Sequence, residues 1–327
     1  MTAEMDVVEW LPFLEREYLD EFIRDGGASV KFIVPHDQKG KQAIIEGLET
    51  SAIKRGYRIA SASAGETKIH LMDQLFFRVA EQIPWEQLAR SVVESLARRD
   101  NYAIPDTSDQ PFIEAMARIN DLDEAFVSMA LRKLVSGAVF KRRNLAKDFR
   151  VAMSQLCLAQ IAGGSDGATT SAAIIDWLTG RIKTVGAIKP YNIFTRINRN
   201  NARYFFESLL DWIQFAGSSG LIISLDASRL TVAKNPRDGQ IFYSKAGRLD
   251  AYELLRQFVD ATDRMRGLLF VIIPDIEFLD ESPTSNGIGE YQALYFRVFD
   301  EIRDREMVNP MGSLIRISQN PIEEAIK

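Results

Sequence analysis

The chain has 327 residues, 46% of them hydrophobic, and a formal net charge of −5, which is typical of a folded globular protein with one large domain or two. This acidic balance excludes a general attraction to nucleic acid or anionic membranes, so such binding would need a local basic patch. The single cysteine, Cys157, excludes a disulfide within the chain, and its apolar surroundings indicate a buried thiol. With only two histidines besides, a zinc site is not expected.

The beginning of the chain predicts a helix rather than a membrane anchor. Residues 1–9 carry acids where a signal peptide would be basic, and no stretch of the chain reaches 18 consecutive apolar residues. Apolar residues then recur at helical spacing over 10–24, and Gly26 and Gly27 end the pattern. We therefore expect a cytoplasmic protein with no membrane contact.

A strand, a helix and a second strand follow. The run VKFIV (30–34) is apolar, rich in β-branched residues and bounded by glycine and proline, which indicates a buried strand. The apolar pattern of 40–55 is helical, and Gly56 follows it where a C′ glycine is expected. Residues 57–62 have strand character again. This order is that of the βαβ unit of a parallel sheet.

The segment 68–211 consists almost entirely of helical patterns. A glycine-rich sequence at 163–167 interrupts it and predicts a flexible, exposed loop. A long all-α stretch between strands predicts a helical insertion into the sheet-forming part of the chain. The helices are expected at 71–81, 85–97, 112–118, 122–140, 145–161, 171–179 and 201–215.

Strand character returns after the helical segment. Apolar runs at 220–225, 267–273 and 313–318 predict three more strands, and helical patterns fit 251–265 and 291–303. We therefore expect an α/β fold with a parallel sheet of about five strands and a large all-helical insertion. The expected domains are 1–67 (N-terminal helix and first half of the core), 68–211 (helical insertion) and 212–327 (second half of the core with a C-terminal helix and strand).

The loop after the first strand contains part of a phosphate-binding motif. A P-loop, G-x-x-x-x-G-K-[ST], lies between a strand and a helix; its backbone amides curl around phosphates, its lysine reaches the terminal phosphates and its hydroxyl binds magnesium. Gly40 and Lys41 have the place and spacing of this motif. However, Pro35 stands at the first glycine and offers no N–H, Asp37 adds a negative charge, and Gln42 replaces the hydroxyl. From these residues alone, a plain structural loop is the other interpretation.

A second part of such a site is expected after the strand at 220–225. There, P-loop proteins carry an acid that binds magnesium, usually followed by a glutamate that activates water. Asp226 supplies the acid, but Ala227 stands at the glutamate position, and loss of a general base commonly costs about 10²–10⁴ in rate. Asp275 follows the strand at 267–273, where an active enzyme has a polar sensor residue, and its role stays open. A turn or helix-capping acid is the alternative interpretation of Asp226.

Two groups of basic residues are candidates for contacts with a partner protein or with the phosphates of a nucleic acid. The first group is Lys141, Arg142, Arg143, Lys147 and Arg150, and the second is Arg196, Arg199 and Arg203. A solvated helix face is the other interpretation of both groups.

Three segments carry a resemblance to a known family. The run GGASVKFIV, with the following Gly-Lys pair, helix and KRGYRIASASA, resembles the P-loop segment of the ATP-binding proteins of BREX-type bacteriophage-exclusion systems, relatives of origin-recognition-like AAA+ ATPases. INRNNARYFFESLLDWIQFAGSSGLIISLDA (197–227) resembles that family's helix and acid-bearing strand, and GIGEYQALYFRVFDEI (287–302) resembles its helix after the sensor strand. The resemblance covers 26–318 and implies a P-loop fold of the AAA+ kind. It also implies that Gly40 and Lys41 match the phosphate loop and that Asp226 matches the metal-binding acid.

The departures from the family's pattern at Pro35, Gln42 and Ala227 imply a subunit that no longer hydrolyses ATP. The vestigial nucleotide site is expected at Gly40, Lys41, Gln42 and Asp226. No catalytic residue and no metal site are expected, and either no cofactor or weakly held ATP and magnesium. The expected function is assembly, as a degenerate subunit that binds other defence-system proteins such as an active ATPase, or that forms a homo-oligomer. An ATP-binding switch or slow ATPase of the same system and a DNA-binding subunit are the alternatives.

Overall fold

The chain forms two compact units, here called the sheet unit and the helical unit. The computed structural model describes residues 4–106, 111–182, 184–299 and 308–318. The sheet unit comprises Met1–Val79 and Ser218–Lys327, and the helical unit is Ala80–Gly217. The helical unit therefore interrupts the sheet unit in the sequence.

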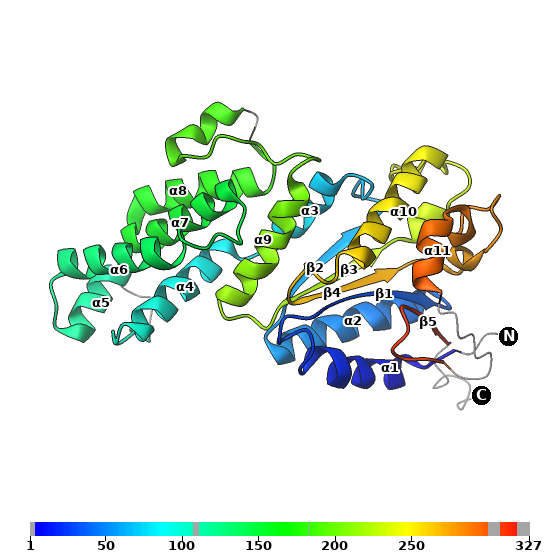
Figure 1. Ribbon diagram of the computed structural model, residues 1–327, viewed down its shortest axis with the longest axis horizontal. Helices are drawn as coiled ribbons and strands as arrows, with labels where there is room; N and C mark the ends of the chain where they lie inside the picture. The colour runs from blue at the N-terminus through cyan, green and yellow to red at the C-terminus, as the bar shows by residue number, and fades with distance from the viewer. Residues whose placement is uncertain (1–3, 107–110, 183, 300–307, 319–327) are drawn as a thin grey trace. The chain divides into compact units, whose positions relative to one another are not determined.

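A five-stranded sheet in which all the pairings are parallel forms the centre of the sheet unit (Figure 1). The strands are β1 (Ala28–Pro35), β2 (Arg58–Ser63), β3 (Leu221–Asp226), β4 (Leu268–Ile273) and β5 (Leu314–Ile317). Their order is β2-β3-β4-β1-β5. β4 is buried along its whole length, as expected for a central strand of a parallel sheet that is covered on both faces. The expected α/β fold is thus confirmed.

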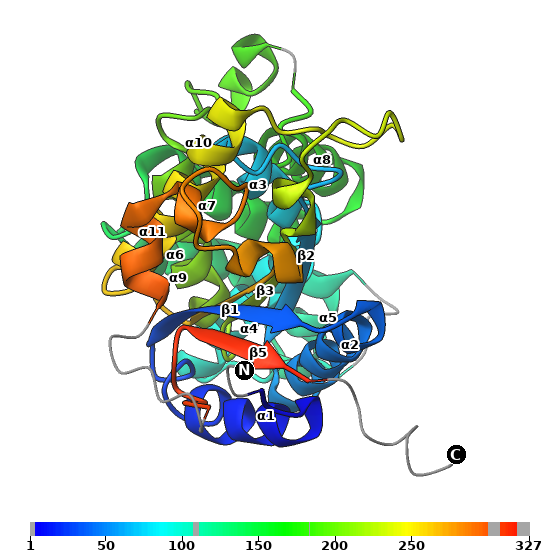
Figure 2. The ribbon, with the colours of Figure 1, turned by 90° about the vertical axis from the view of Figure 1, so that its right-hand side faces the viewer.

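One face of the sheet packs against the N-terminal helices. α1 (Val7–Leu14) continues into a π-helical turn, Glu15–Leu19, and α2 (Gln38–Arg55) connects β1 to β2. Apolar residues of these helices form one cluster with alternate residues of β4, including Leu269 and Val271. Figure 2 shows β5 beside β1, with α1 lying along them. Because side chains alternate along a strand, Phe270, which lies between them, faces the opposite side of the sheet.

The opposite face packs against α10 (Lys245–Asp260). Phe258 of α10 meets Phe270 of β4 edge-on, with ring centroids 4.8 Å apart. Phe32 of β1 stacks on Phe278, with centroids 5.5 Å apart. These rings are almost fully buried, so aromatic packing fixes α10 and the segment after β4 on this face.

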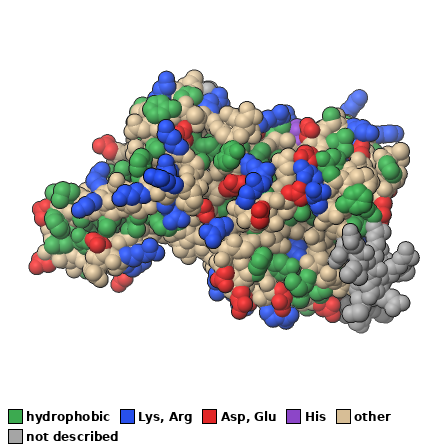
Figure 3. Space-filling view, viewed as in Figure 1, with side chains coloured by type: hydrophobic (Ala, Val, Ile, Leu, Met, Phe, Trp, Pro, Cys, Tyr) green, Lys and Arg blue, Asp and Glu red, His purple; other side chains and the backbone are tan. Residues whose placement is uncertain are grey.

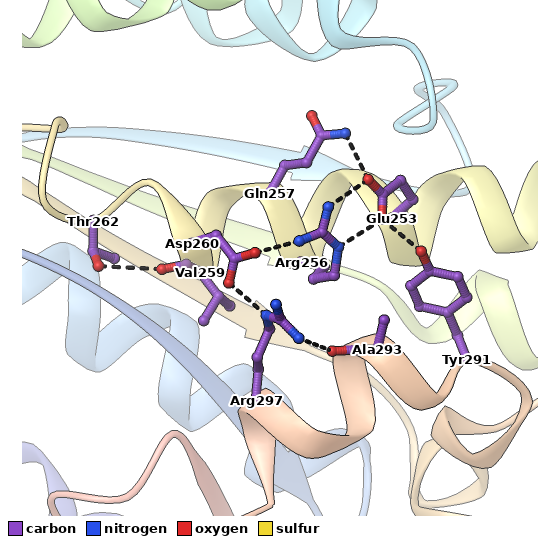
Figure 4. A network of polar contacts seen from close by, with 9 residues as sticks. All are labelled: Glu253, Arg256, Gln257, Val259, Asp260, Thr262, Tyr291, Ala293 and Arg297. Atoms are coloured by element: carbon purple, nitrogen blue, oxygen red, sulfur yellow. Dashed lines mark hydrogen bonds and ion pairs between the residues drawn. The ribbon is translucent and has the colours of Figure 1, made fainter.

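Polar contacts connect α10 to α11 (Gln292–Val298) (Figure 4). The Tyr291 hydroxyl donates to Glu253 Oε2 at 2.5 Å, and Arg297 Nε lies 2.5 Å from Asp260 Oδ1. These side chains are partly exposed, so each pair contributes little to stability by itself. The pairs chiefly fix how α11 lies along α10.

The helical unit is built around α7 (Lys147–Ala162), which packs against α4, α6 and α8. Aromatic rings meet in the core of this unit; for example, Trp177 of α8 and Phe205 of the later helix at Ala202–Phe215 have ring centroids 5.3 Å apart. Most of α7 is buried, as expected for a helix surrounded by others. The other helices of the insertion are α4 (Trp85–Arg99), α5 (Phe112–Asn120), α6 (Glu124–Ala138), α8 (Gly164–Leu178) and α9 (Ala202–Phe215), and α3 (Met72–Ala80) precedes them.

The glycine-rich sequence 163–167 does not form the predicted loop. A single residue, Gly163, separates α7 from α8, which begins at Gly164. Both residues have positive φ angles, 62° and 57°, which glycine adopts without strain. Gly167 lies within α8, and a Cβ there would be 2.5 Å from the Ala159 carbonyl oxygen. The prediction was wrong because these glycines allow a sharp turn and a close helix contact.

Three predicted helices also have different limits. The helix expected at 171–179 is α8, which begins at Gly164 and ends at Leu178. The helix expected at 251–265 begins at Lys245, where the Ser244 hydroxyl accepts a hydrogen bond from Gly247 N, and it ends at Asp260. The helix expected at 291–303 is α11, and its part beyond 299 lies outside the described residues. Within the described part of the chain, no helix combines the length and the hydropathy needed to cross a bilayer.

Candidate functional site

The carboxyl ends of β1, β3 and β4 lie at one edge of the sheet. β4 pairs with both β1 and β3, and Asp226 at the end of β3 is in register with Ile273 at the end of β4. The segments that follow these strands therefore converge, which is where α/β sheets bind ligands. Lys41, Asp226 and Asp275 all belong to these segments.

The connection between β1 and α2 is a two-residue turn. β1 ends at Pro35 and α2 begins at Gln38. Asp37 caps the helix, because its Oδ1 accepts a hydrogen bond from Gly40 N at 2.8 Å. Gly40 thus lies in the first helical turn, and a Cβ there would meet nothing closer than 3.5 Å. The Asp37 carboxylate therefore accepts a hydrogen bond from the Gly40 N–H. In a P-loop, a backbone N–H in this place would bind a phosphate.

Lys41 and Asp226 form an ion pair at the centre of the site. Lys41 Nζ lies 2.6 Å from Asp226 Oδ2 and 3.5 Å from Ser228 Oγ. The other oxygen of Asp226, Oδ1, accepts hydrogen bonds from Ser228 Oγ at 2.6 Å and from Ser228 N at 3.1 Å. Both oxygens of the carboxylate are therefore engaged within the chain, as is the lysine charge.

Gln42 follows Lys41 in the sequence and Ala227 follows Asp226. Neither side chain has a hydroxyl that could bind magnesium or a base that could activate water. Gln42 is exposed and its amide donates to Glu46 Oε1, one turn further along α2, at 2.8 Å. Ala227 is buried and has no polar side-chain atom. The second acid at this edge is Asp275, which follows β4.

Asp275 is held by a threonine rather than by a cation. Its Oδ2 accepts a hydrogen bond from Thr231 Oγ1 at 2.5 Å, while its Oδ1 is buried and accepts none. Burial raises the pKa of the Asp275 carboxyl to about 6. Near neutral pH this buried carboxylate is charged, which costs the fold free energy. Carboxyl groups with raised pKa values of this kind are common at functional sites.

The site as a whole does not fit a magnesium-bound nucleoside triphosphate. The turn after β1 is too short to wrap a phosphate chain, and Asp37 already caps the helix that would receive it. Magnesium would find the Asp226 carboxylate, but that group is paired with Lys41. Elsewhere among the described residues, no cluster of three or more His, Cys, Asp or Glu side chains could hold a metal ion.

The basic residues predicted as contact sites divide into two kinds. Arg142 is half-buried, with its guanidinium carbon 4.1 Å from the centre of the Phe215 ring, and Arg203 is half-buried, 3.6 Å from Glu207. Arg150 is also half-buried, with its guanidinium carbon 5.6 Å from the centre of the Phe140 ring. The remaining predicted side chains are exposed: Lys141, Arg143, Lys147, Arg196 and Arg199. Arg142, Arg150 and Arg203 therefore serve the packing of the helical unit, and the exposed five remain available for contacts.

Cys157 is the buried thiol that its apolar surroundings predict. Its Sγ lies in the core of the helical unit, 3.7 Å from the Ala89 carbonyl oxygen. Burial raises the pKa of the Cys157 thiol far above its usual range, so the group is uncharged and unreactive. The cysteine therefore takes no part in the candidate site.

Two residues of the site, Ser228 and Thr231, were not predicted from the sequence, and a third, Asp37, was given a different role. Ser228 and Thr231 lie in the short 3-10 turn after β3, and they hold Asp226 and Asp275. Ser228 could have been predicted, because it lies two residues after Asp226 and an aspartate side chain commonly forms a local turn with the residue two positions later. Asp37 was interpreted only as a negative charge in the loop. It lies just before the helical pattern that begins at Gly40, and an aspartate in such a place also predicts a helix N-cap.

The comparisons with known proteins identify the family. The chain matches the family described as "BREX system ATP-binding protein BrxC/D" over residues 15–325, nearly its whole length. Neither the curated proteins nor the solved structures gave a match. The match agrees with the segments that resemble BREX proteins. The chain belongs to the BREX system ATP-binding protein family, and its role lies in a phage-defence system.

Proposed function

We propose that the chain is a pseudo-ATPase subunit of its phage-defence system, which contributes protein contacts rather than ATP hydrolysis. The observation that carries this proposal is the engagement of the phosphate-site groups with one another. Lys41 is paired with Asp226, and Asp37 caps the amide of Gly40. A nucleotide would have to break both interactions before it gained any contact of its own, which weakens its binding.

The lost side chains support the same proposal. Ala227 offers no base to activate water, and removal of a general base commonly costs about 10²–10⁴ in rate. Gln42 points along the surface of α2 toward Glu46 and offers no hydroxyl for magnesium. Either loss alone would slow hydrolysis, and the two together remove both the metal contact and the base.

Assembly is the function that such a chain retains. The sheet unit keeps the complete parallel sheet with helices on both faces, which is a rigid support for contact surfaces. Membership of a BREX system implies other components of that system as partners. We expect a stable complex with an active ATPase or another component, or a homo-oligomer.

An ATP-binding switch is the second candidate. The family is described as ATP-binding, and this chain keeps both Lys41 and Asp226 at the appropriate edge of the sheet. In this reading ATP displaces Asp226 from Lys41 and binds without being hydrolysed. The two candidates differ in nucleotide affinity, not in fold.

Calorimetry and a turnover assay on the purified chain test the proposal. We expect no magnesium-dependent ATPase activity above background and no magnesium-dependent heat of ATP binding. Saturable binding of ATP without turnover, abolished in Lys41→Ala, would instead establish the switch. Turnover that disappears in Lys41→Ala would refute both candidates.

Co-purification tests the assembly part independently. The tagged chain is expressed with the proteins encoded beside it, and its mass is measured by light scattering. We expect co-elution with at least one of them, or a homo-oligomer. A strictly monomeric chain at micromolar concentration that retains none of these proteins would contradict assembly.

A further inference from the structure

The charge of the helical unit is unevenly distributed along its sequence. Residues 125–206 contain thirteen Lys and Arg but only three Asp and Glu, although the whole chain has a net charge of −5. Two of these acids are already engaged: Asp148 is buried and hydrogen-bonded, and Asp176 lies 3.8 Å from Arg181. The acids of this region therefore leave most of its positive charge unbalanced.

The start of α7 brings three separate segments of this region together. Asp148 Oδ2 accepts hydrogen bonds from Thr195 Oγ1 at 2.5 Å and from Thr195 N at 3.1 Å. Ser208 Oγ accepts from Ala146 N at 2.9 Å and donates to the Tyr204 carbonyl oxygen at 2.7 Å. The start of α7, the segment before α9 and the first two turns of α9 are thus neighbours.

These neighbouring segments carry exposed cations that have no ion-pair partner among the described residues. Figure 3 shows Lys and Arg side chains spread over the helices of this unit, with Asp and Glu mostly near its margin. We call these cations, together with the exposed rings described next, the basic face. Its cations are Lys141, Arg143, Lys147, Arg196 and Arg199.

Three exposed aromatic rings lie in the same segments. Phe140 is 53% exposed, Phe194 57% and Tyr204 63%, so each ring offers part of its surface to a ligand. The guanidinium carbon of Arg150 lies 5.6 Å from the centre of the Phe140 ring, so a cation supports one side of it. Exposed rings among cations can stack on flat groups of a ligand while the cations bind its charges.

We propose that the basic face binds a single-stranded nucleic acid, with its phosphates on the cations and its bases stacked on the rings. Cations alone attract any polyanion, but rings interleaved with them match a strand whose bases are unpaired. In a duplex the bases stack on one another and offer no free face to these rings. An acidic protein segment would use the cations and would have no comparable use for three separate rings. This binding does not depend on the nucleotide site.

Fluorescence anisotropy of the full chain with labelled oligonucleotides tests the proposal. The probes are single-stranded DNA and RNA of the same sequence, about 20 nucleotides long, and the corresponding DNA duplex, each titrated from about 50 to 200 mM salt. We expect a single strand to bind more tightly than the duplex, with affinity that falls steeply with salt. The DNA and RNA arms show which sugar the face accepts.

Two sets of variants separate the cations from the rings. The triple change Arg143→Ala, Lys147→Ala and Arg196→Ala should weaken binding about tenfold or more and lower the salt slope by roughly 2. Tyr204→Ala should weaken single-strand binding about tenfold and leave duplex binding unchanged. The matched controls are Lys54→Ala with Arg99→Ala and Lys234→Ala for the charges, and Phe296→Ala for the ring; all four side chains are exposed outside the basic face.

Three results would overturn the proposal. The first is the absence of binding by the unmodified chain at low salt. The second is an equal loss in the charge controls, which would indicate attraction by overall charge. The third is unchanged binding in both Tyr204→Ala and Phe194→Ala, which would indicate a general polyanion surface such as one for an acidic protein. Melting temperatures of all variants show whether they remain folded.

Discussion

Lys41 on α2 and Asp226 at the end of β3 are joined by an ion pair with 2.6 Å between Nζ and Oδ2, and both side chains are largely shielded from solvent. The pair links the helix after the first strand to the end of β3, an inner strand of the sheet. Ser228 holds the other carboxylate oxygen, so the pair is fixed in one geometry. Groups that would serve a nucleotide in a P-loop therefore serve the stability of this fold, and this can be measured.

A double-mutant cycle on this pair should show a clear coupling energy. Lys41→Met and Asp226→Asn are each expected to lower the free energy of unfolding by about 1–2 kcal/mol, because each leaves a largely buried charge unpaired. The double variant should lose about 1 kcal/mol less than the sum of the two, as measured by urea denaturation. The control cycle is Arg98 with Glu94, an exposed pair 3.7 Å apart, where coupling near zero is expected. Equal coupling in the two cycles would mean that Lys41 and Asp226 do not meet in solution.

The stability of the sheet unit should depend on the protonation of Asp275. Burial raises the pKa of this carboxyl from 3.8 to about 6, so the folded chain binds the proton more tightly than the unfolded chain. The free energy of unfolding should therefore fall as the pH rises through this window, and the extra stability is complete only below the unfolded pKa.

Asp275→Asn isolates this effect, because asparagine still accepts the Thr231 hydroxyl but does not titrate. The difference in unfolding free energy between variant and unmodified chain should shift in favour of the variant by on the order of 1 kcal/mol between about pH 4 and pH 7, allowing for partial solvent screening. Denaturation at several pH values gives this difference directly. A difference that does not change with pH would contradict the raised pKa.

Breaking the buried ion pair between Arg248 and Glu290 should cause one of the largest losses in the free energy of unfolding of the sheet unit. Arg248 Nε lies 2.5 Å from Glu290 Oε2, and the two side chains are only 6% and 5% exposed. Arg248→Met leaves a buried carboxylate without its main partner and should cost about 3 kcal/mol. Arg118→Met, at an exposed pair with Glu114 of 2.8 Å, should cost less than about 0.5 kcal/mol. A cost for Arg248→Met no larger than for this control would show that the buried pair is not formed.

The strands and the order of elements were predictable because their signals are local. The run of six buried residues in β4 is apolar throughout, and Gly56 ends α2 with a φ of 71°, as a C′ glycine does. The same local signals placed Lys41 and Asp226 in segments that converge in a parallel sheet. Their ion pair was not predictable, because it depends on how α2 approaches the end of β3.

The residues that the sequence did not reveal act through contacts between distant segments. Arg248 and Glu290 are 42 positions apart, and nothing in either neighbourhood marks them as partners. The basic face is similar, since the sequence showed the cations but not that Tyr204 and Phe194 stay exposed beside them. Composition was misleading at 163–167, where Gly163 and Gly164 form a sharp turn with positive φ angles and Gly167 allows a close helix contact.

Two glycines of the helical unit should respond to alanine in opposite directions. Gly137 lies in α6 with nothing within 4 Å of the position of a Cβ, so Gly137→Ala should raise the free energy of unfolding by up to about 1 kcal/mol through helix propensity and reduced chain entropy. Gly167 lies in α8, where a Cβ would be 2.5 Å from the Ala159 carbonyl oxygen, a backbone atom that a side-chain rotation cannot move. Gly167→Ala should therefore separate α8 from α7 and cost about 1–3 kcal/mol. The two substitutions add the same methyl group to a helix, so their difference in urea denaturation measures the close contact alone. Stabilisation of the chain by Gly167→Ala would mean that α7 and α8 are not in contact there and that 163–167 is the loop that its composition suggests.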